Sequence, residues 1–341
     1  MEAPAYGQCD CRNAPLNERV CVIVNPAAGR GRGAMLLPRI RSTFEAHGVR
    51  DVITTSEWKD ERALATEAIA RGFTTIVCVG GDGTTGNVAN AILHSGADTR
   101  LAVVSAGTGN DFAKTLGTDG ESLGMVARRS VASVGSRVDV GRVEDTFFLN
   151  SCGFGFDVAV LQGLGNIRWL KGSAVYIYAA LTELLRFRGL HATVESTALT
   201  RKRALHMMVL IANGPFFGGG LPIAPTASVT DGELDAIAVH DVGAIRRLMM
   251  LAAVARGKHW AYPEVHIERA AGFSVRFDTI PFYETDGEVH EAKSTSLTVY
   301  CVPGALRVVT GDTGLRLPAI PRIRSGVPRG KFARSPRPIE K

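Results

Sequence analysis

The chain has 341 residues, of which 45% are hydrophobic and 21% are charged, a composition typical of globular proteins. This length predicts two domains rather than one. No stretch of about 18 apolar residues lacks a charge, which argues against a transmembrane helix. The polar start of the chain, Met1 to Asn17, argues against a signal peptide, so we expect a cytoplasmic protein.

Strands and helices alternate in the first third of the chain. The predicted strands are 20–24, 51–54, 74–79 and 101–105, and the predicted helices are 35–47, 60–71 and 84–93. This alternation is typical of an α/β domain with a Rossmann-like parallel sheet covered by helices on both faces. Ligands bind such sheets beyond the carboxyl ends of the strands, where the Gly-rich loops of this region fall.

From about residue 138 the pattern changes to strands separated by glycine and polar turns. The predicted strands are 138–143, 146–150, 190–195, 205–213, 233–239, 272–278 and 296–302, and the predicted helices are 175–187 and 242–256. A second, mostly antiparallel β-sandwich domain follows from this pattern. The predicted organisation is an N-terminal extension (1–18), an α/β domain (19–136), a β-sandwich domain (137–310) and a tail (311–341).

The net charge of +6 is concentrated in the tail. Residues 316–341 hold eight Lys or Arg residues and five prolines but one acid, Glu340. This composition predicts an extended, disordered segment. Such a tail can bind an anionic membrane surface, and a solubilising appendage is the alternative. We expect no nucleic-acid binding, because Phe332 is the one aromatic side chain among these charges.

The cysteines predict neither a disulfide framework nor a zinc site. Four of the six lie in apolar runs, where a thiol behaves as a small hydrophobic side chain: Cys21, Cys78, Cys152 and Cys301. Cys9 and Cys11 are closely spaced, but no second pair or histidine cluster follows to complete a ligand set.

The strongest local motif is Gly80-Gly81-Asp82-Gly83-Thr84, between a predicted strand and a predicted helix. Glycines let backbone N–H groups approach phosphate oxygens, and the start of a helix favours an anion. An acid in this turn would repel phosphate unless a divalent cation or a transferring proton lay between them. A helix-capping Asp82 is the alternative, but it does not account for three glycines and Thr84.

A second loop, Gly107-Thr108-Gly109-Asn110-Asp111-Phe112, follows the strand at 101–105 in the same way. Parallel strands bring both loops to one edge of the sheet, which places Asp82 and Asp111 around one cleft. That arrangement suits a nucleotide and metal-assisted phosphoryl transfer. Helix capping by Asn110 or Asp111 is the alternative for either residue alone.

A third Gly-rich loop covers residues 25–34. From Gly29 to Ala34 it satisfies the dinucleotide-binding pattern, but its glycines begin five residues after the strand rather than directly after it. We favour a phosphate-proximal loop in which Arg30 and Arg32 reach a polyphosphate or a lipid headgroup. A solvated basic turn is the alternative.

Two further features complete the motif survey. Asp286-Gly287-Glu288 lies on a turn between two strands, and by composition alone it is a tight hairpin. The chain has no Walker phosphate-binding motif and no metalloprotease or hydrolase signature.

The order of these motifs resembles the diacylglycerol kinase catalytic-domain family, which also contains sphingosine, ceramide and bacterial phosphatidylglycerol kinases. The resemblance covers residues 20–310 and rests on six segments: Asn25-Pro26 with Gly29, Gly80 to Thr84, Gly107 to Phe112, Asn150 with Gly153 to Asp157, Gly218 to Asp235, and Asp286 to Glu288. It implies an ATP-binding α/β domain of NAD-kinase-like fold and a β-sandwich that takes the lipid acceptor.

The resemblance also implies roles for single residues. Residues assigned to ATP binding are Asn25, Thr55, Gly80, Gly81, Asp82, Gly83, Thr84, Thr85, Gly86, Gly107, Thr108 and Asn110. Asp82 and Asp111 would organise the catalytic Mg²⁺, and Glu288 matches the general base that takes the proton of the lipid hydroxyl. A structural Mg²⁺ would bind Ser228, Asp231 and Glu233.

Two positions depart from the bacterial pattern of the family. Bacterial members often carry Asn and Glu where this chain has Gly86 and Asn87, so an acid of the metal shell is missing. Ala28 stands where Ser is common, which removes one hydrogen bond to phosphate.

The resulting hypothesis is an ATP-dependent kinase that converts diacylglycerol to phosphatidic acid at the membrane, as a step of phospholipid biosynthesis. Sphingoid bases and ceramide are alternative acceptors. An NAD kinase and a non-catalytic lipid-binding homologue are alternatives of other classes, and a homodimer is left open. Residues 167–187 and 244–254 suit either a lip through which lipid enters or core helices, and we favour the core.

Overall fold

The computed structural model describes residues 19–56, 60–164, 173–196 and 203–310. The predicted N-terminal extension and basic tail lie outside these residues. Trp169 and Leu170, which belong to the predicted lipid lip, also lie outside them.

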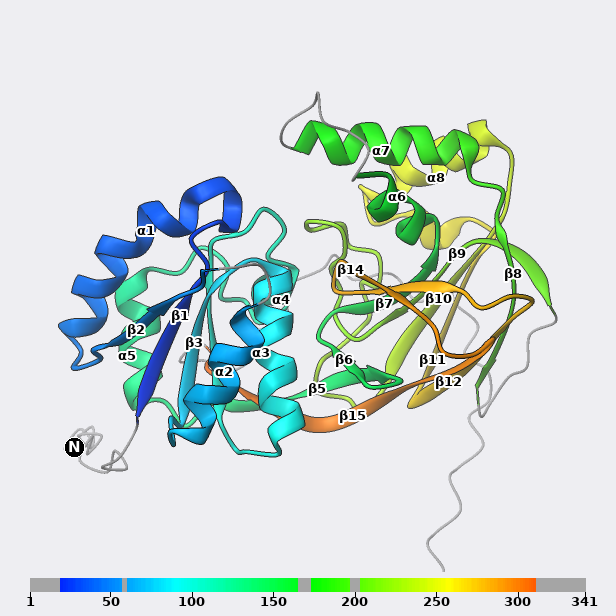
Figure 1. Ribbon diagram of the computed structural model, residues 1–341. Coiled ribbons are helices and arrows are strands. Elements are labelled where there is room, and N and C mark those ends of the chain that lie inside the picture. The colour runs from blue at the N-terminus through cyan, green and yellow to red at the C-terminus, as the bar shows by residue number, and fades with distance from the viewer. Residues whose placement is uncertain (1–18, 57–59, 165–172, 197–202, 311–341) are drawn as a thin grey trace, which may run out of the picture.

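The N-terminal part of the chain is a parallel sheet with strand order β2-β1-β3-β4. The strands are β1 (Val20–Val24), β2 (Asp51–Thr54), β3 (Thr75–Gly80) and β4 (Arg100–Ser105). Helices α1 (Ala28–Glu45) and α5 (Leu123–Ala132) cover one face, and α2 (Asp60–Ala70) and α3 (Asp82–Ser95) cover the other (Figure 1). The short helix α4 (Asp111–Thr115) follows β4. The predicted α/β architecture is confirmed, and α5 is an addition to it.

Burial on both faces explains why these strands are continuous apolar runs. All five residues of β1 and all six of β3 are buried. A strand covered on one side only would alternate apolar and polar residues.

The remaining strands are mostly antiparallel and form a β-sandwich, as predicted. They are β5 (Ser136–Val143), β6 (Thr146–Phe148), β7 (Ser151–Gly155), β8 (Leu190–Ser196), β9 (Ala204–Ala212), β10 (Leu234–His240), β11 (Val265–Ala270), β12 (Gly272–Phe277), β13 (Phe282–Thr285), β14 (Glu288–Glu291) and β15 (Ser296–Val308). One core is filled from β7, β9 and β10 on one side and from β8, β12 and β15 on the other, including Phe154, Ile211 and Phe273.

Helices lie against the outside of this sandwich. They are α6 (Phe156–Leu164), α7 (Ser173–Arg186), α8 (Ala244–Val254) and the 3₁₀ turn η1 (His259–Ala261). Leu184 of α7 and Met250 of α8 pack with Leu210 and Ile237 on the outer face of β9 and β10. Among the described helices, none combines the length and apolar character needed to cross a bilayer.

The last strand joins the two parts of the molecule. β15 runs antiparallel to β5 and β12, and at its end Arg307 and Val308 pair in parallel with Arg100 and Leu101 of β4. A register shift between Val302 and Leu306 marks the change of partner. The sheet is therefore continuous across the whole molecule, and the division at residue 136 stays a prediction.

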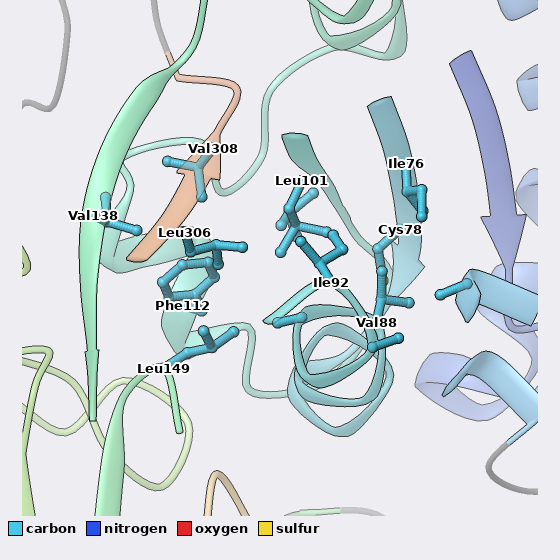
Figure 2. Packing of buried hydrophobic residues seen from close by; sticks show 14 of the residues in the cluster. Ile76, Cys78, Val88, Ile92, Leu101, Phe112, Val138, Leu149, Leu306 and Val308 are labelled. Carbon is cyan, nitrogen blue, oxygen red and sulfur yellow. The ribbon is translucent and has the colours of Figure 1, made fainter. Parts of the chain in front are cut away.

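The core beside α3 fixes the second Gly-rich loop. Figure 2 shows Phe112 packed between Leu306 and Leu149, with Leu101 and Ile92 beyond them. Phe112 is 1% exposed and is the neighbour of Asp111 in sequence. The position of Asp111 is therefore set by the packing of β4, α3 and β15.

We expect Phe112→Ala to lower the free energy of unfolding by about 3–5 kcal/mol, because it leaves a cavity in this core. Urea unfolding followed by circular dichroism measures the change. Phe282→Ala is the matched control, since Phe282 is 46% exposed, and it should cost less than about 1 kcal/mol. Equal losses in the two variants would contradict the assignment of Phe112 to the core.

Candidate active site

The two Gly-rich loops of the α/β part touch through their backbones. A Cβ atom added to Gly107 would lie 2.4 Å from the Cα of Gly81. Gly107 therefore leaves no room for a side chain, and a Cβ on Gly81 would be a tight contact at 3.1 Å from the Cα of Gly107. The loop after β1 joins them, because Gly29, at φ +56°, lies so close to β4 that an added Cβ would fall 2.0 Å from the carbonyl oxygen of Ala106.

A loop from the β-sandwich completes this contact. A Cβ on Gly109 would lie 2.6 Å from Oδ2 of Asp82 and 3.6 Å from the Cα of Gly219. The backbone N–H of Gly219 donates a hydrogen bond of 2.9 Å to Oδ2 of Asp111. The predicted pair, Asp82 and Asp111, is thus brought together, with the Gly218–Gly220 segment against it.

Asp82 is a carboxyl with a shifted pKa. Burial, and secondly the nearby charge of Asp111, raise its pKa to about 6, although the N–H of Phe112 opposes the shift through a hydrogen bond of 3.3 Å. Lys114 balances part of this negative charge, since its Nζ lies 3.5 Å from Asp111 and donates to the carbonyl of Gly109 at 2.7 Å. The sequence analysis did not single out Lys114.

The turn at residues 286–288 faces these acids from the β-sandwich. Oδ1 of Asp286 accepts hydrogen bonds from the N–H groups of Asn150 (2.8 Å) and Ser151 (3.2 Å), and Oδ2 accepts from the N–H of Leu149 (2.6 Å). Burial raises the pKa of Asp286 to about 7, and the charge of Asp82 contributes to the rise. Asp286 therefore fixes the turn to β7 and lies within electrostatic range of Asp82.

Glu288, the predicted general base, reaches α3 across this interface. A Cβ on Gly83 would lie 3.9 Å from Oε1 of Glu288, and Nδ2 of Asn87 lies 3.4 Å from the same oxygen. Figure 1 shows α3 and α4 on one side and β14 and β7 on the other. The unusual Asn87 has a local explanation, because its amide donates to Glu288 where an acid would repel it.

Two buried acids that sequence reasoning missed support this turn. Oε2 of Glu284 accepts a hydrogen bond of 2.7 Å from the N–H of Gly287. A Cβ on Gly153 would lie 1.6 Å from Oδ2 of Asp157 and 2.9 Å from Oε1 of Glu284, and neither oxygen has a protein hydrogen-bond partner. An acid inside the otherwise apolar strand β13 was the signal available in the sequence.

Asp157 and Glu284 cannot both ionise easily. Burial raises the pKa of Asp157 to about 7. Burial, and secondly the charge of Asp157, raise the pKa of Glu284 well above its ordinary value. Two carboxyls close together in one apolar site raise the cost of ionising both. The pair lies beneath the turn at residues 286–288, where its environment favours the protonated form.

Several residues predicted to bind ATP use their side chains to shape the loops. Nδ2 of Asn25 donates to Oγ1 of Thr84 (3.0 Å) and to Oε1 of the buried Glu61 (2.9 Å). Asn110, at φ +57°, closes its own loop through two hydrogen bonds with the backbone of Gly107. Their contribution to ATP binding through the backbone stays a prediction.

The other predicted residues lie at the same sheet edge. Thr55 follows β2 and its N–H donates to the carbonyl of Val24. Thr85 is buried, and its hydroxyl donates to the carbonyl of Gly81. Thr108 is exposed on its loop, whereas Gly86 is buried on α3. ATP contact by these four residues stays a prediction.

The residues present fit a catalytic Mg²⁺ of the kind that binds nucleotides. Mg²⁺ at such sites takes one or two carboxylates and fills the rest of its shell with phosphate oxygens and water. Asp82 and Asp111 supply two carboxylates on neighbouring loops. Within the described part of the chain, no three His, Cys, Asp or Glu side chains form a metal cluster.

The predicted structural Mg²⁺ site holds a guanidinium group. Nε of Arg269 lies 2.8 Å from Oδ1 of the buried Asp235, and its Nη1 lies 3.6 Å from Oδ2 of Asp231. Glu233 is 3.9 Å from the same side chain, and Ser228 bonds Thr230 through its hydroxyl. Arg269 thus neutralises part of this acidic segment, and metal binding there stays a prediction.

Comparisons with known proteins assign both parts of the chain. Residues 19–143 match the family described as "Diacylglycerol kinase catalytic domain", and residues 150–310 match "YegS C-terminal NAD kinase beta sandwich-like domain". Diacylglycerol kinase of Mycobacterium tuberculosis is 28% identical over 297 residues, which cover 85% of this chain and 94% of that protein.

Two further likenesses agree with this assignment. A "Probable lipid kinase YegS-like" protein of Pseudomonas putida is 32% identical over 241 residues, 68% of this chain and 79% of that protein. The crystal structure of a diacylglycerol kinase from Bacillus anthracis superposes with a TM-score of 0.66 at 20% identity, covering 87% of this chain and 98% of that chain. This structural likeness shows the fold.

The buried acid pair predicts a pH dependence of stability. Asp157 has a pKa of about 7 in the folded chain, well above the usual value near 4, so folding favours its protonated form. Its contribution to stability is full below about pH 4 and is lost as the pH rises through about 7, at no more than about 1.4 kcal/mol per pH unit.

We expect Asp157→Asn to flatten this dependence, because it removes the titrating group. Urea unfolding at several values between about pH 4 and pH 8 measures the slope of the unfolding free energy. Asp119→Asn, at an exposed position, is the control and should keep the wild-type slope. An unchanged slope in Asp157→Asn would show that Asp157 does not titrate in this range.

Proposed function

The chain belongs to the diacylglycerol kinase catalytic-domain family of lipid kinases, and on that premise we propose that it transfers the γ-phosphoryl group of ATP to the hydroxyl of diacylglycerol, giving phosphatidic acid. The observation that carries the proposal is the convergence of Asp82, Asp111 and Glu288 from two different parts of the chain. Phosphoryl transfer depends on positioning and charge neutralisation, and this arrangement supplies carboxylates for a metal beside a base for the acceptor.

Each group has a task in the proposed reaction. The backbone N–H groups of Gly81 and Gly83, at the start of α3, would bind phosphate oxygens of ATP. Mg²⁺, held by Asp82 and Asp111, would neutralise phosphate charge. Lys114 lies beside Asp111 and adds a positive charge on the same side. These groups orient the nucleotide toward the β-sandwich.

Glu288 is the base in this proposal. Its carboxylate accepts a hydrogen bond from Asn87 and stands near Gly83, next to the turn that would bind the nucleotide. A carboxylate placed there can take the hydroxyl proton of the acceptor as the new P–O bond forms and the bond to ADP breaks. Asp286 and Glu284 hold the turn that carries Glu288 and do not themselves need to contact substrate.

The proposal predicts that Glu288→Gln lowers the kinase rate by at least about 100-fold, because the amide cannot accept the proton. The measurement is phosphate transfer from labelled ATP to diacylglycerol in mixed micelles with Mg²⁺. Glu291→Gln is the matched control, since Glu291 is an exposed acid on the same strand, β14, and should keep wild-type activity. Full activity in Glu288→Gln would remove Glu288 from the mechanism.

Asp82→Asn tests the other half of the mechanism. It should lower kcat by at least about 100-fold and raise the Mg²⁺ concentration needed for half-maximal rate, because one carboxylate of the metal shell is lost. Asp98→Asn, at an exposed position before β4, is the control. A variant that loses activity without any change in Mg²⁺ dependence would place Asp82 outside the metal shell.

The acceptor is identified in the same assay. Micelles that contain diacylglycerol, ceramide, sphingosine or no lipid are compared, with NAD as a soluble acceptor. Label in phosphatidic acid supports the proposed reaction. Label in a sphingolipid keeps the mechanism and changes the acceptor, whereas label in NADP alone refutes a lipid acceptor.

A further inference from the structure

Helices α7 and α8 carry apolar side chains on the surface that points away from the sandwich. On α7 these are Tyr178, Leu181 and Leu185, at spacings of three and four residues. On α8 they are Ile245, Leu248 and Met249, at the same kind of spacing. We call these six residues the docking face. Leu185 is 71% exposed and Ile245 is 81% exposed.

The opposite sides of both helices pack against the protein. The predicted core role of these two segments therefore describes one side of each helix. Leu184 and Met250 pack on β9 and β10. Buried Arg247 ties the two helices together, because its guanidinium donates to the carbonyl of Leu184 at 2.7 Å and also bonds Asp241. Both helices cover the same face of the sheet and contact each other, so their exposed stripes lie on one outer surface (Figure 1).

Basic side chains border the docking face. Arg186 and Arg188 follow Leu185 at the end of α7, and Arg256 and Lys258 follow α8; all four are exposed. Among the neighbouring acids, Asp241 bonds Arg247 and Glu264 bonds Arg246, while Glu183 of α7 is half-buried with its carboxylate near Gly163 of α6. An apolar stripe with a positive border matches the interface of an anionic bilayer. A second copy of the same surface would bring the basic borders together, which is unfavourable.

We propose that the docking face seats this protein on an anionic lipid bilayer, with the apolar side chains inserted among the headgroups and the four basic residues against lipid phosphates. The proposal deepens the proposed function and rests on it, because a kinase with a membrane lipid as acceptor must reach that lipid at the bilayer surface. It assigns this contact to folded helices, whereas the sequence analysis considered the basic tail for it and favoured a core role for these helices.

The packing connects the docking face to the catalytic turn. α7 packs on α6, and α6 packs on β13 and β14, the strands that flank residues 286–288. One helix layer therefore separates the docking face from the strand that begins with Glu288. A bilayer seated on α7 and α8 lies on the side of the β-sandwich from which its lipid can approach this base.

The test is sedimentation of the full chain with sucrose-loaded vesicles, in the absence of ATP. Vesicles of phosphatidylcholine with phosphatidylglycerol are compared with vesicles of phosphatidylcholine alone. We expect binding to the anionic vesicles, and we expect the double variant Leu185→Glu/Ile245→Glu to weaken it by about tenfold or more, because two inserted side chains become charged. Circular dichroism and the unfolding midpoint verify that the variant is folded.

Val134→Glu is the matched control, since Val134 is 75% exposed but lies between α5 and β5, far from α7 in the fold. It introduces the same charge change per site and should leave vesicle binding at the wild-type level. Binding by the double variant equal to that of Val134→Glu would overturn the proposal and assign membrane contact to another segment.

Size-exclusion chromatography with light scattering provides the second reading. A wild-type dimer that becomes a monomer in the double variant, with vesicle binding unchanged, would identify the docking face as an interface between copies and refute the proposal. Because vesicle binding is measured without ATP, its failure is distinguishable from failure of the kinase assay. Charge reversal of Arg186 and Arg188 should weaken binding to the anionic vesicles and make the remaining binding less sensitive to salt.

Discussion

The close backbone approach of Gly81 and Gly107 is the constraint on which the site depends. Side chains at these positions would hold the loops after β3 and β4 apart, since an added Cβ on Gly107 meets the Cα of Gly81 at 2.4 Å. With the loops in contact, Asp82 lies against Gly109, and Asp111 follows at the start of α4. The packing of Phe112 in the core prevents the second loop from relaxing outward. Loop contact and core packing together place two carboxylates close together, where the charge of Asp111 contributes to the raised pKa of Asp82.

The buried acids at this interface lower the stability of the folded chain, because burial makes their ionisation unfavourable. The pKa values of Asp82, Asp157 and Asp286 are raised to about 6, 7 and 7, in each case chiefly by burial. A structure optimised for stability alone would replace such groups. They are offset in different ways: Asp286 accepts three backbone hydrogen bonds, Asp82 accepts one from the N–H of Phe112, and Asp157 lies beside Glu284 without a hydrogen-bond partner among the described residues. In the proposed mechanism Asp82 also binds the cation.

The sequence predicted the α/β part more completely than the β-sandwich, for a physical reason. Strands such as Val20–Val24 are apolar throughout and lie between helical patterns, so both their type and their order are visible. β14, in contrast, reads Glu-Val-His-Glu and is half-exposed, and β13 carries a buried acid, so neither shows a strand pattern. The candidate acids Asp82, Asp111 and Glu288 were singled out from motif order, but Glu284 was not, because its role depends on a partner, Asp157, that is distant in sequence.

Helix α6 connects the buried pair Asp157 and Glu284 with helix α7 at the surface. Its first turn contains Asp157, whose carboxyl lies next to Glu284 beneath the turn at residues 286–288. Along its length it packs on α7, which carries half of the docking face. In the proposed membrane-bound state, this packing connects the bilayer contact to the turn that carries Glu288. Proton transfer from a lipid hydroxyl requires contact within hydrogen-bonding distance, so the proposed mechanism depends on where this turn lies relative to the lipid headgroups.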